Sequence, residues 1–249
     1  MGQLEGKTAV VTGGGTGIGL ASAVRLAADG AHVFVTGRRK AELDAAVETI
    51  GAARATAVAG DTTDPADLDR LYEAVRARGR GLDVVFANAA TAALVPLEEI
   101  THEHFDQIFG VNVWGPLLTV QKALPLLNDG ASVILNASTA AGNGAEAFSL
   151  YAASKAAVRT FARGWANELK DRGVRVNAVS PGPVDTPGIT NLFGAENAPG
   201  VREKLATDTA VGRMGRPEEV AAVVAFLASG QSSFVYGANW YVDGGENQI

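Results

Sequence analysis

The sequence predicts an α/β fold in which a doubly wound parallel sheet of about seven strands carries helices on both faces. Two observations predict it. Short apolar segments alternate with longer stretches of helical periodicity along the whole chain of 249 residues, a pattern typical of parallel sheets covered by helices. No proline-rich or polar linker divides the chain, and we therefore expect a single domain over residues 1–249.

The expected strands are short apolar runs between the helical stretches. They lie at 8–12, 33–36, 55–59, 84–87, 132–136, 175–180 and 240–242. Apolar residues recur at the spacing of a helix face at 18–29, 40–50, 65–78, 101–127, 150–172 and 217–229. Residues 187–214 have no clear period and are rich in Gly, Asn, Ala and Thr, which predicts a mobile lid.

Composition bounds the kind of protein. With 47% hydrophobic and 19% charged residues, the chain can form a full apolar core. Its net charge of −6 argues against general binding to nucleic acid or an anionic membrane surface. It has no cysteine, and no stretch approaches the ~20 apolar residues of a membrane span. We therefore expect a cytoplasmic protein with no nucleic-acid or membrane partner.

A glycine-rich turn, T-G-G-G-T-G-I-G at residues 12–19, separates the first expected strand from the first helix. Glycine lets the backbone approach a pyrophosphate closely, and the free amides and dipole of a helix N-terminus attract its charge. At the first strand-helix turn of an alternating chain, this string predicts dinucleotide binding and a Rossmann fold.

The end of the second strand indicates which dinucleotide is bound. A site for NAD usually offers a carboxylate there to the ribose 2′-hydroxyl. Here the chain has Arg38 and Arg39, and the nearest carboxylate is Glu42, inside the next helix. Because guanidinium groups pair well with phosphate, the sequence favours NADP(H). The alternative is that both arginines are solvated residues at the start of a helix.

Ser138, Tyr151 and Lys155 form a candidate active site. Tyr151 and Lys155 are four residues apart and share one helix face, and Ser138 follows an apolar strand. A free phenol titrates near pH ~10, so proton exchange near neutral pH requires a lowered pKa. We expect the Lys155 ammonium and the helix N-terminus to lower the pKa of Tyr151. The alternative is an exposed helix turn without function.

In this order and spacing, the motifs resemble those of the short-chain dehydrogenase/reductase family, in particular its single-domain branch. The residues that carry the resemblance are the turn at 12–19, Asn88-Ala89-Ala90, Asn112, Ser138, Tyr151, Lys155 and Pro181-Gly182. One departure is Ala90, where the family more often has glycine. The resemblance implies a fold that spans the whole chain and hydride transfer between a nicotinamide and a carbonyl carbon.

The resemblance also implies residue roles. The pyrophosphate would be lined by Gly13, Gly17, Ile18 and Gly19, and the adenine would meet Asp61. The segment of Asn88 and Ala89 would pass beneath the cofactor, and Thr186 would bind the nicotinamide carboxamide. Lys155 would also hold the nicotinamide ribose, and Asn112 would kink its helix and hold a water through its carbonyl. Further expected cofactor contacts are Thr16, Thr62, Tyr151, Pro181, Gly182 and Val184. Capping and turn chemistry is the alternative for Asn88 and Asp61.

The expected reaction interconverts a ketone and a secondary alcohol. Tyr151 would act as general acid and base, while Ser138 would hold the substrate oxygen. Residues 142–148, with Thr91, Leu94, Ile189, Leu192 and Phe193, offer a mostly apolar wall, which favours a small carbonyl or alcohol substrate with apolar substituents. No metal is expected, because the three histidines lack ligand spacing.

Three further expectations stay open. The runner-up enzyme is a 3-oxoacyl-[acyl-carrier-protein] reductase, although the turn at 128–130 lacks the basic pair that a carrier protein would contact. A non-catalytic dinucleotide-sensing regulator is a third interpretation, and retention of its cellular effect by Tyr151→Phe would favour it. The resemblance implies a homotetramer through the helix at 150–172 and the helix-strand pair at 217–242.

Overall fold

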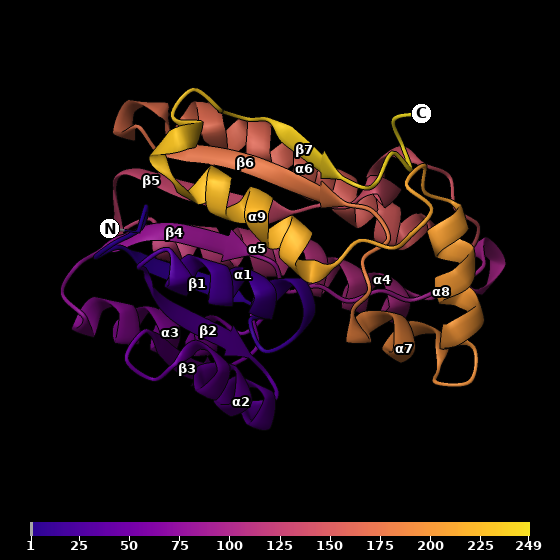
Figure 1. The fold of residues 1–249 in the computed structure, drawn as a ribbon, viewed down its shortest axis with the longest axis horizontal. Helices are drawn as coiled ribbons and strands as arrows, with labels where there is room; N and C mark the ends of the chain where they lie inside the picture. The colour runs from indigo at the N-terminus through magenta and orange to yellow at the C-terminus, as the bar shows by residue number, and fades with distance from the viewer. Residues whose placement is uncertain (1) are drawn as a thin grey trace.

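The computed structural model describes residues 2–249 and contains, over that range, one parallel sheet of seven strands in the order β3-β2-β1-β4-β5-β6-β7. The strands are β1 Thr8–Thr12, β2 His32–Gly37, β3 Ala55–Ala59, β4 Leu82–Ala87, β5 Leu127–Asn136, β6 Arg175–Pro181 and β7 Asn239–Val242. The order runs outward from β1 in one direction and from β4 in the other, which confirms the doubly wound sheet. In Figure 1 the strand arrowheads all lie toward the side that carries α7 and α8.

Helices cover both faces of the sheet. They are α1 Gly17–Ala28, α2 Lys40–Ile50, α3 Pro65–Ala77, α4 His102–Phe109, α5 Gly115–Ala123, α6 Ser149–Glu168, α7 Pro187–Phe193, α8 Ala198–Thr207 and α9 Pro217–Ala228. On one face α1, α2 and α9 bury Leu26, Leu43 and Val224 against the strands, and on the other α3, α5 and α6 bury Leu71, Leu118 and Val158. The alternation of apolar segments therefore produced two cores, one on each side of the sheet (Figure 1).

The single helix expected at 101–127 is interrupted. A π-helical turn at Gly110–Trp114 separates α4 from α5, and the chain leaves helical structure before β5 begins at Leu127. The apolar period continues across this point, which is why the sequence pattern predicted one helix. The π-turn contains Asn112, the residue at which the family resemblance implied a kink.

Residues 187–214 are more ordered in secondary structure than their lack of period predicted. They contain α7 and α8, each with a proline in the first turn, where the missing amide costs no hydrogen bond. Arg202 Nε on α8 donates to Asp185 Oδ1 at 2.8 Å and so ties this helix to the segment before α7. The segment lies beyond the carboxyl ends of the strands (Figure 1), and its role as a lid stays a prediction.

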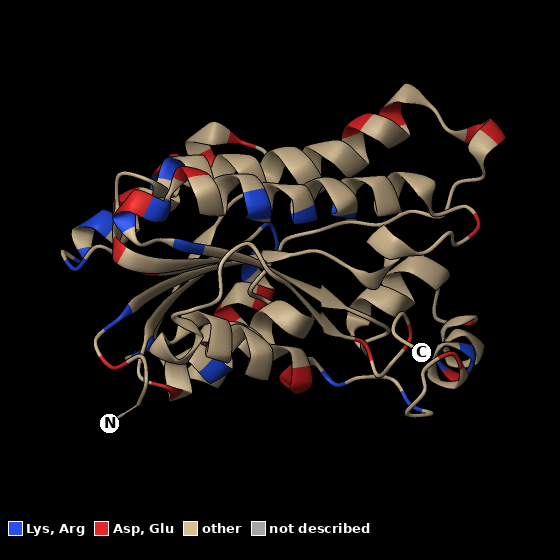
Figure 2. Cartoon of the chain, turned by 90° about the horizontal axis from the view of Figure 1, so that it is seen from above, with Lys and Arg blue, Asp and Glu red and all other residues tan. Residues whose placement is uncertain are grey.

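Charged residues of both signs are interspersed over the helices and loops (Figure 2). Within residues 2–249 no helix is both long and apolar enough to cross a membrane. The three histidines make local contacts: His104 takes part in the capping box of α4, His102 lies 3.3 Å from Asp106, and His32 hydrogen-bonds Thr56.

Candidate active site

The turn between β1 and α1 forms a cradle that side chains would fill. Gly13 and Gly17 have φ of +62° and +55°, a region that favours glycine. A Cβ on Gly19 would lie 2.1 Å from the carbonyl oxygen of Gly13, and one on Gly13 would lie 3.0 Å from Asn88 Nδ2. The side chain of the N-cap residue Thr16 makes no capping hydrogen bond, so the α1 amides remain available to an anion. The residues present therefore fit a dinucleotide pyrophosphate.

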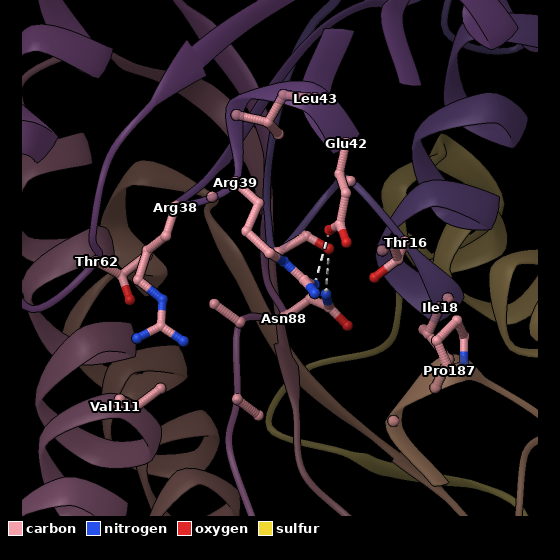
Figure 3. A pocket seen from close by; sticks show the side chains of 18 of the residues that line it. Thr16, Ile18, Arg38, Arg39, Glu42, Leu43, Thr62, Asn88, Val111 and Pro187 are labelled. Atoms are coloured by element: carbon pink, nitrogen blue, oxygen red, sulfur yellow. Dashed lines mark hydrogen bonds and ion pairs between the residues drawn. The ribbon is translucent and has the colours of Figure 1, made fainter. Parts of the chain in front are cut away.

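A cavity extends from this turn along the ends of β2, β3 and β4 (Figure 3). Many of the predicted cofactor residues line it: Gly13, Thr16, Gly17, Ile18, Gly19, Arg38, Arg39, Asp61, Thr62, Asn88, Ala89 and Thr186. Residues that the sequence did not single out for the cofactor also line it: Gly15, Gly37, Glu42, Leu43, Gly60, Ala90, Val111, Pro187 and Gly188. The methyl group of Ala90 thus lies at the cavity wall, where the family more often has glycine.

Both arginines of the second turn face this cavity, but each is paired with a carboxylate. Arg39 Nη2 lies 2.7 Å from Glu42 Oε2 and Arg38 Nη1 lies 4.0 Å from Asp61 Oδ2; Figure 3 shows Arg39 directed toward Glu42. Asp61 Oδ1 also accepts hydrogen bonds from the backbone and side chain of Thr63. The cavity therefore offers two cations whose charge is already partly balanced, and a bound phosphate would compete with Glu42 and Asp61 for them.

A chain of hydrogen bonds joins the glycine turn to Lys155. Asn88 Nδ2 donates to the carbonyl of Thr12 at 2.9 Å, Asn136 Nδ2 donates to Asn88 Oδ1 at 2.9 Å, and Lys155 Nζ donates to the carbonyl of Asn136 at 2.7 Å. Each link crosses from one element to the next at the carboxyl edge of the sheet. Asn136 was missed by the sequence argument, although it stands two residues before Ser138 at the end of the same strand.

Asn112 is 1% exposed and uses its whole amide. Its Oδ1 accepts from the backbone N–H of Thr91 at 2.8 Å, while its Nδ2 donates to the Thr91 carbonyl at 2.8 Å and to Ser154 Oγ at 3.0 Å. The side chain therefore binds the π-turn to the segment after β4 and to α6. Asn112 positions the helix that carries Tyr151 and Lys155 through these contacts.

Ser138, Tyr151 and Lys155 lie together at the end of β5. Ser138 caps the short turn Thr139–Gly142, and its Oγ accepts from Ala140 N–H at 3.1 Å, so its hydroxyl hydrogen can donate to a second oxygen. Tyr151 is in the first turn of α6, and Lys155 Nζ lies 5.6 Å from the centroid of the Tyr151 ring. The geometry brings a hydroxyl, a phenol and an amine to one place, as their spacing predicted.

The charge state of this trio differs from the sequence-based expectation. Burial raises the pKa of Tyr151, and the hydrogen bond with Ser138 lowers it by less. Burial also lowers the pKa of Lys155 to about 7. The residue is 2% exposed, and its amine donates to a backbone carbonyl and not to a carboxylate. In the chain without cofactor the pKa of the phenol is therefore raised and not lowered as the sequence led us to expect, because desolvation outweighs the other contributions.

Three predicted cofactor residues lie outside the residues that line the cavity, as do Tyr151 and Lys155. Pro181 ends β6 and its carbonyl accepts from Thr139 Oγ1 at 3.2 Å. Gly182 N–H donates to the carbonyl of Val242 at 3.1 Å, and Val184 is buried where its segment pairs with Gly215. These residues position the turn of Ser138 and the approach to Thr186.

The chain has relatives along its full length. Residues 13–247 match the model of a family described as enoyl-(acyl carrier protein) reductase. Oxidoreductase asL5 of Sarocladium schorii is 47% identical over 99% of this chain and 98% of its own length. Sorbitol dehydrogenase of Cereibacter sphaeroides is 35% identical over 98% of each chain. A short-chain dehydrogenase/reductase of Serratia marcescens, solved as a mutant, superposes with a TM-score of 0.90 at 34% identity, covering 98% of this chain and 99% of that one.

Fold, glycine cradle and the serine-tyrosine-lysine trio together define a dinucleotide-binding oxidoreductase. The chain belongs to the short-chain dehydrogenase/reductase family. Members of this family use nicotinamide dinucleotides, so the fit of the cradle to a pyrophosphate and the family agree. Within residues 2–249 no three His, Asp or Glu side chains gather in a way that could hold a metal ion.

Proposed function

We propose that this protein is an NADP(H)-dependent oxidoreductase that interconverts a ketone and a secondary alcohol. The observation that carries the proposal is the placement of Ser138, Tyr151 and Lys155 together at the carboxyl edge of the sheet, where the cavity of the glycine turn also opens. When bound, the cofactor supplies or accepts the hydride. The chain supplies orientation and the proton.

In reduction, Tyr151 donates its phenolic proton to the carbonyl oxygen, and in oxidation it takes the proton back. Ser138, whose Oγ accepts from Ala140 and can still donate, holds the same oxygen as negative charge develops. Lys155 lies beside the ring and stabilises the phenolate that reduction leaves behind. Asn136 and Asn112 fix the lysine and the helix, respectively.

Support for NADP(H) comes from the second turn. Arg38 and Arg39 both face the cavity, and either can exchange its carboxylate partner for a 2′-phosphate. The opposing charge of Glu42 and Asp61 lessens the preference. We therefore expect NADPH to be favoured over NADH, with activity from both.

The direct test is the initial rate of NADPH and NADH consumption over a panel of uncharged ketones and diketones. Turnover of ketones with NADPH is expected, and Tyr151→Phe should reduce kcat about 10²–10⁴-fold. Equal activity of Tyr151→Phe and the parent chain would refute the assignment of the general acid. A preference for NADH would refute the phosphate-binding role of Arg38.

A second candidate is a reductase of acyl groups carried on a carrier protein, because the matching family model bears the name of such an enzyme. Adding acetoacetyl and crotonyl thioesters to the panel separates the two. Preferred turnover of a thioester would move the assignment to this candidate. Absence of turnover with every substrate would favour a dinucleotide-sensing regulator.

We also propose a homotetramer. Large apolar side chains are exposed around β7, among them Phe234 at 101% and Trp240 at 36%, and Trp114 at the end of the π-turn is 46% exposed. A second copy would cover them. Sedimentation as a monomer at micromolar concentration would contradict this assembly. A cytoplasmic location stays a prediction.

A further inference from the structure

An aromatic ring lies on the proposed general acid. Phe148, the residue immediately before α6, stacks on Tyr151 with ring centroids 4.4 Å apart and planes inclined by 23°. Both rings are partly buried. The stack occupies one face of the phenol, whereas Lys155 approaches the ring from the following helix turn. The substrate must therefore reach the phenol from a direction that Phe148 leaves open.

The residue before Phe148 has an unfavourable backbone conformation. Ala147 has φ of +57°. Among residues 2–249 it is the only residue besides the glycines that has a positive φ. This left-handed conformation costs an L-residue about 1 kcal/mol or more and persists where the surroundings impose it. Here Ala147 O accepts from Val95 N–H at 2.7 Å, and Phe148 N–H donates to the carbonyl of Ala145 at 3.3 Å. These hydrogen bonds hold the loop in the arrangement in which Phe148 stacks on the tyrosine.

Resting on the proposed function, we propose that Phe148 is a positioning residue for the reaction: its ring fixes the orientation of the Tyr151 phenol and shields it from water, and the left-handed Ala147 holds that ring in place. The groups that face the phenol are Lys155 from α6 and Ser138 from the turn after β5. Burial raises the phenol pKa, and Phe148 supplies part of that burial. Removing the ring should therefore lower the pKa.

The test is the titration of tyrosinate absorbance in the chain without cofactor, over the pH range in which circular dichroism shows the native fold. Subtracting the curve of a matched Tyr151→Phe variant isolates Tyr151 from the other three tyrosines. Phe148→Ala is expected to lower the midpoint of Tyr151 by about one pH unit. Ala147→Val should shift it in the same direction, because a β-branched residue disfavours positive φ.

Two variants serve as controls. Phe148→Trp keeps an aromatic ring on the phenol, and Ala147→Gly keeps the loop conformation without strain; both should leave the midpoint unchanged. An unchanged midpoint in natively folded Phe148→Ala would overturn the proposal. If that variant does not fold, Phe148→Ser, which also removes the ring and its apolar cover, gives the same decision.

Activity separates this proposal from the one on which it rests. In ketone reduction the acid must be protonated, so the rate falls as pH rises through the Tyr151 pKa, and in Phe148→Ala this fall should begin at lower pH. A shifted titration together with no turnover of any carbonyl would refute the proposed reaction and leave the role of the ring standing. Turnover of a ketone together with an unshifted titration would support the proposed reaction and refute the role of the ring.

Discussion

The two halves of the carboxyl edge of the sheet are built differently. Beyond β1, β2 and β3, charged side chains reach into an open cavity: the side chains of Arg38 and Arg39 are 73% and 62% exposed. Beyond β4, β5 and β6, the polar groups of the proposed reaction are enclosed, and Lys155 and Asn112 are 2% and 1% exposed. Charge can therefore be altered with little effect on stability in the first half, whereas in the second it is coupled to folding.

The glycine cradle is a closely packed part of the open half, and breaking it should give the largest effect. In Gly19→Ala the new Cβ would lie 2.1 Å from the carbonyl oxygen of Gly13, so the turn must move. We expect dinucleotide affinity to fall more than about 100-fold and stability to fall by about 1–3 kcal/mol. Fluorescence titration with NADPH and thermal unfolding measure the two effects.

Gly200→Ala is the matched control, because a Cβ on that residue of α8 meets nothing within 4 Å. It should leave dinucleotide affinity unchanged and raise stability by up to about 1 kcal/mol, since alanine favours a helix more than glycine does. Undiminished NADPH affinity in Gly19→Ala would show that the turn does not hold the dinucleotide.

Lys155 tests the coupling of charge to folding in the enclosed half. Its native pKa of about 7 lies below its ordinary value of 10.5, so between these values the unfolded chain binds a proton that the native chain does not. The free energy of unfolding should therefore rise with pH, by up to about 1.4 kcal/mol per pH unit from this group. In Lys155→Met that contribution should be absent.

Urea unfolding at pH 7, 8 and 9 measures the contribution of Lys155 as the difference in the free energy of unfolding between the parent chain and Lys155→Met. Lys204→Met, at an exposed lysine of α8, should keep the parent's dependence on pH. The same slope in Lys155→Met and the parent chain would show that Lys155 is charged across this range.

Glu42 should give the smallest effect and sharpens the contrast. Its ion pair with Arg39 is exposed, so Glu42→Gln should change stability by less than about 0.5 kcal/mol. Releasing Arg39 should strengthen NADPH binding by up to about tenfold and NADH binding little. Asp44→Asn, which removes an exposed carboxylate of the same helix paired with Lys40, is the control. Equal gains for the two cofactors would place Arg39 away from the 2′-phosphate.

The sequence predicted the open half better than the enclosed half. The glycine string, the two arginines and Asp61 are local signals at the ends of recognisable strands, and the arginines, Asp61 and most of the string line the cavity. Glu42 was noticed as the nearest carboxylate but not as a partner of Arg39, because helix position alone does not say where a long side chain points. Side-chain direction is fixed by folding.

In the enclosed half the sequence predicted the residue types but not their burial or the direction of their pKa shifts. Lys155 and Tyr151 share a helix face as their spacing requires, yet their pKa directions follow from burial, which depends on distant segments. The lysine donates to Asn136, nineteen residues away in sequence. No local pattern indicates the backbone conformation of Ala147. Burial and long-range contact are properties of the folded chain, and periods and motifs in the sequence do not contain them.

The π-turn at Gly110–Trp114 limits the insertions and deletions that the chain tolerates between α4 and α5. An α-helix rotates about 100° per residue, so one additional residue turns everything on its N-terminal side by that angle. Deleting one residue there would restore a continuous helix and rotate α4, with its stacked Phe105 and Phe109, away from the side on which it meets α6. The segment therefore tolerates side-chain substitutions more readily than insertions or deletions. The number of residues in the turn sets the rotation of α4 about its axis, and this rotation aligns α4 with α6.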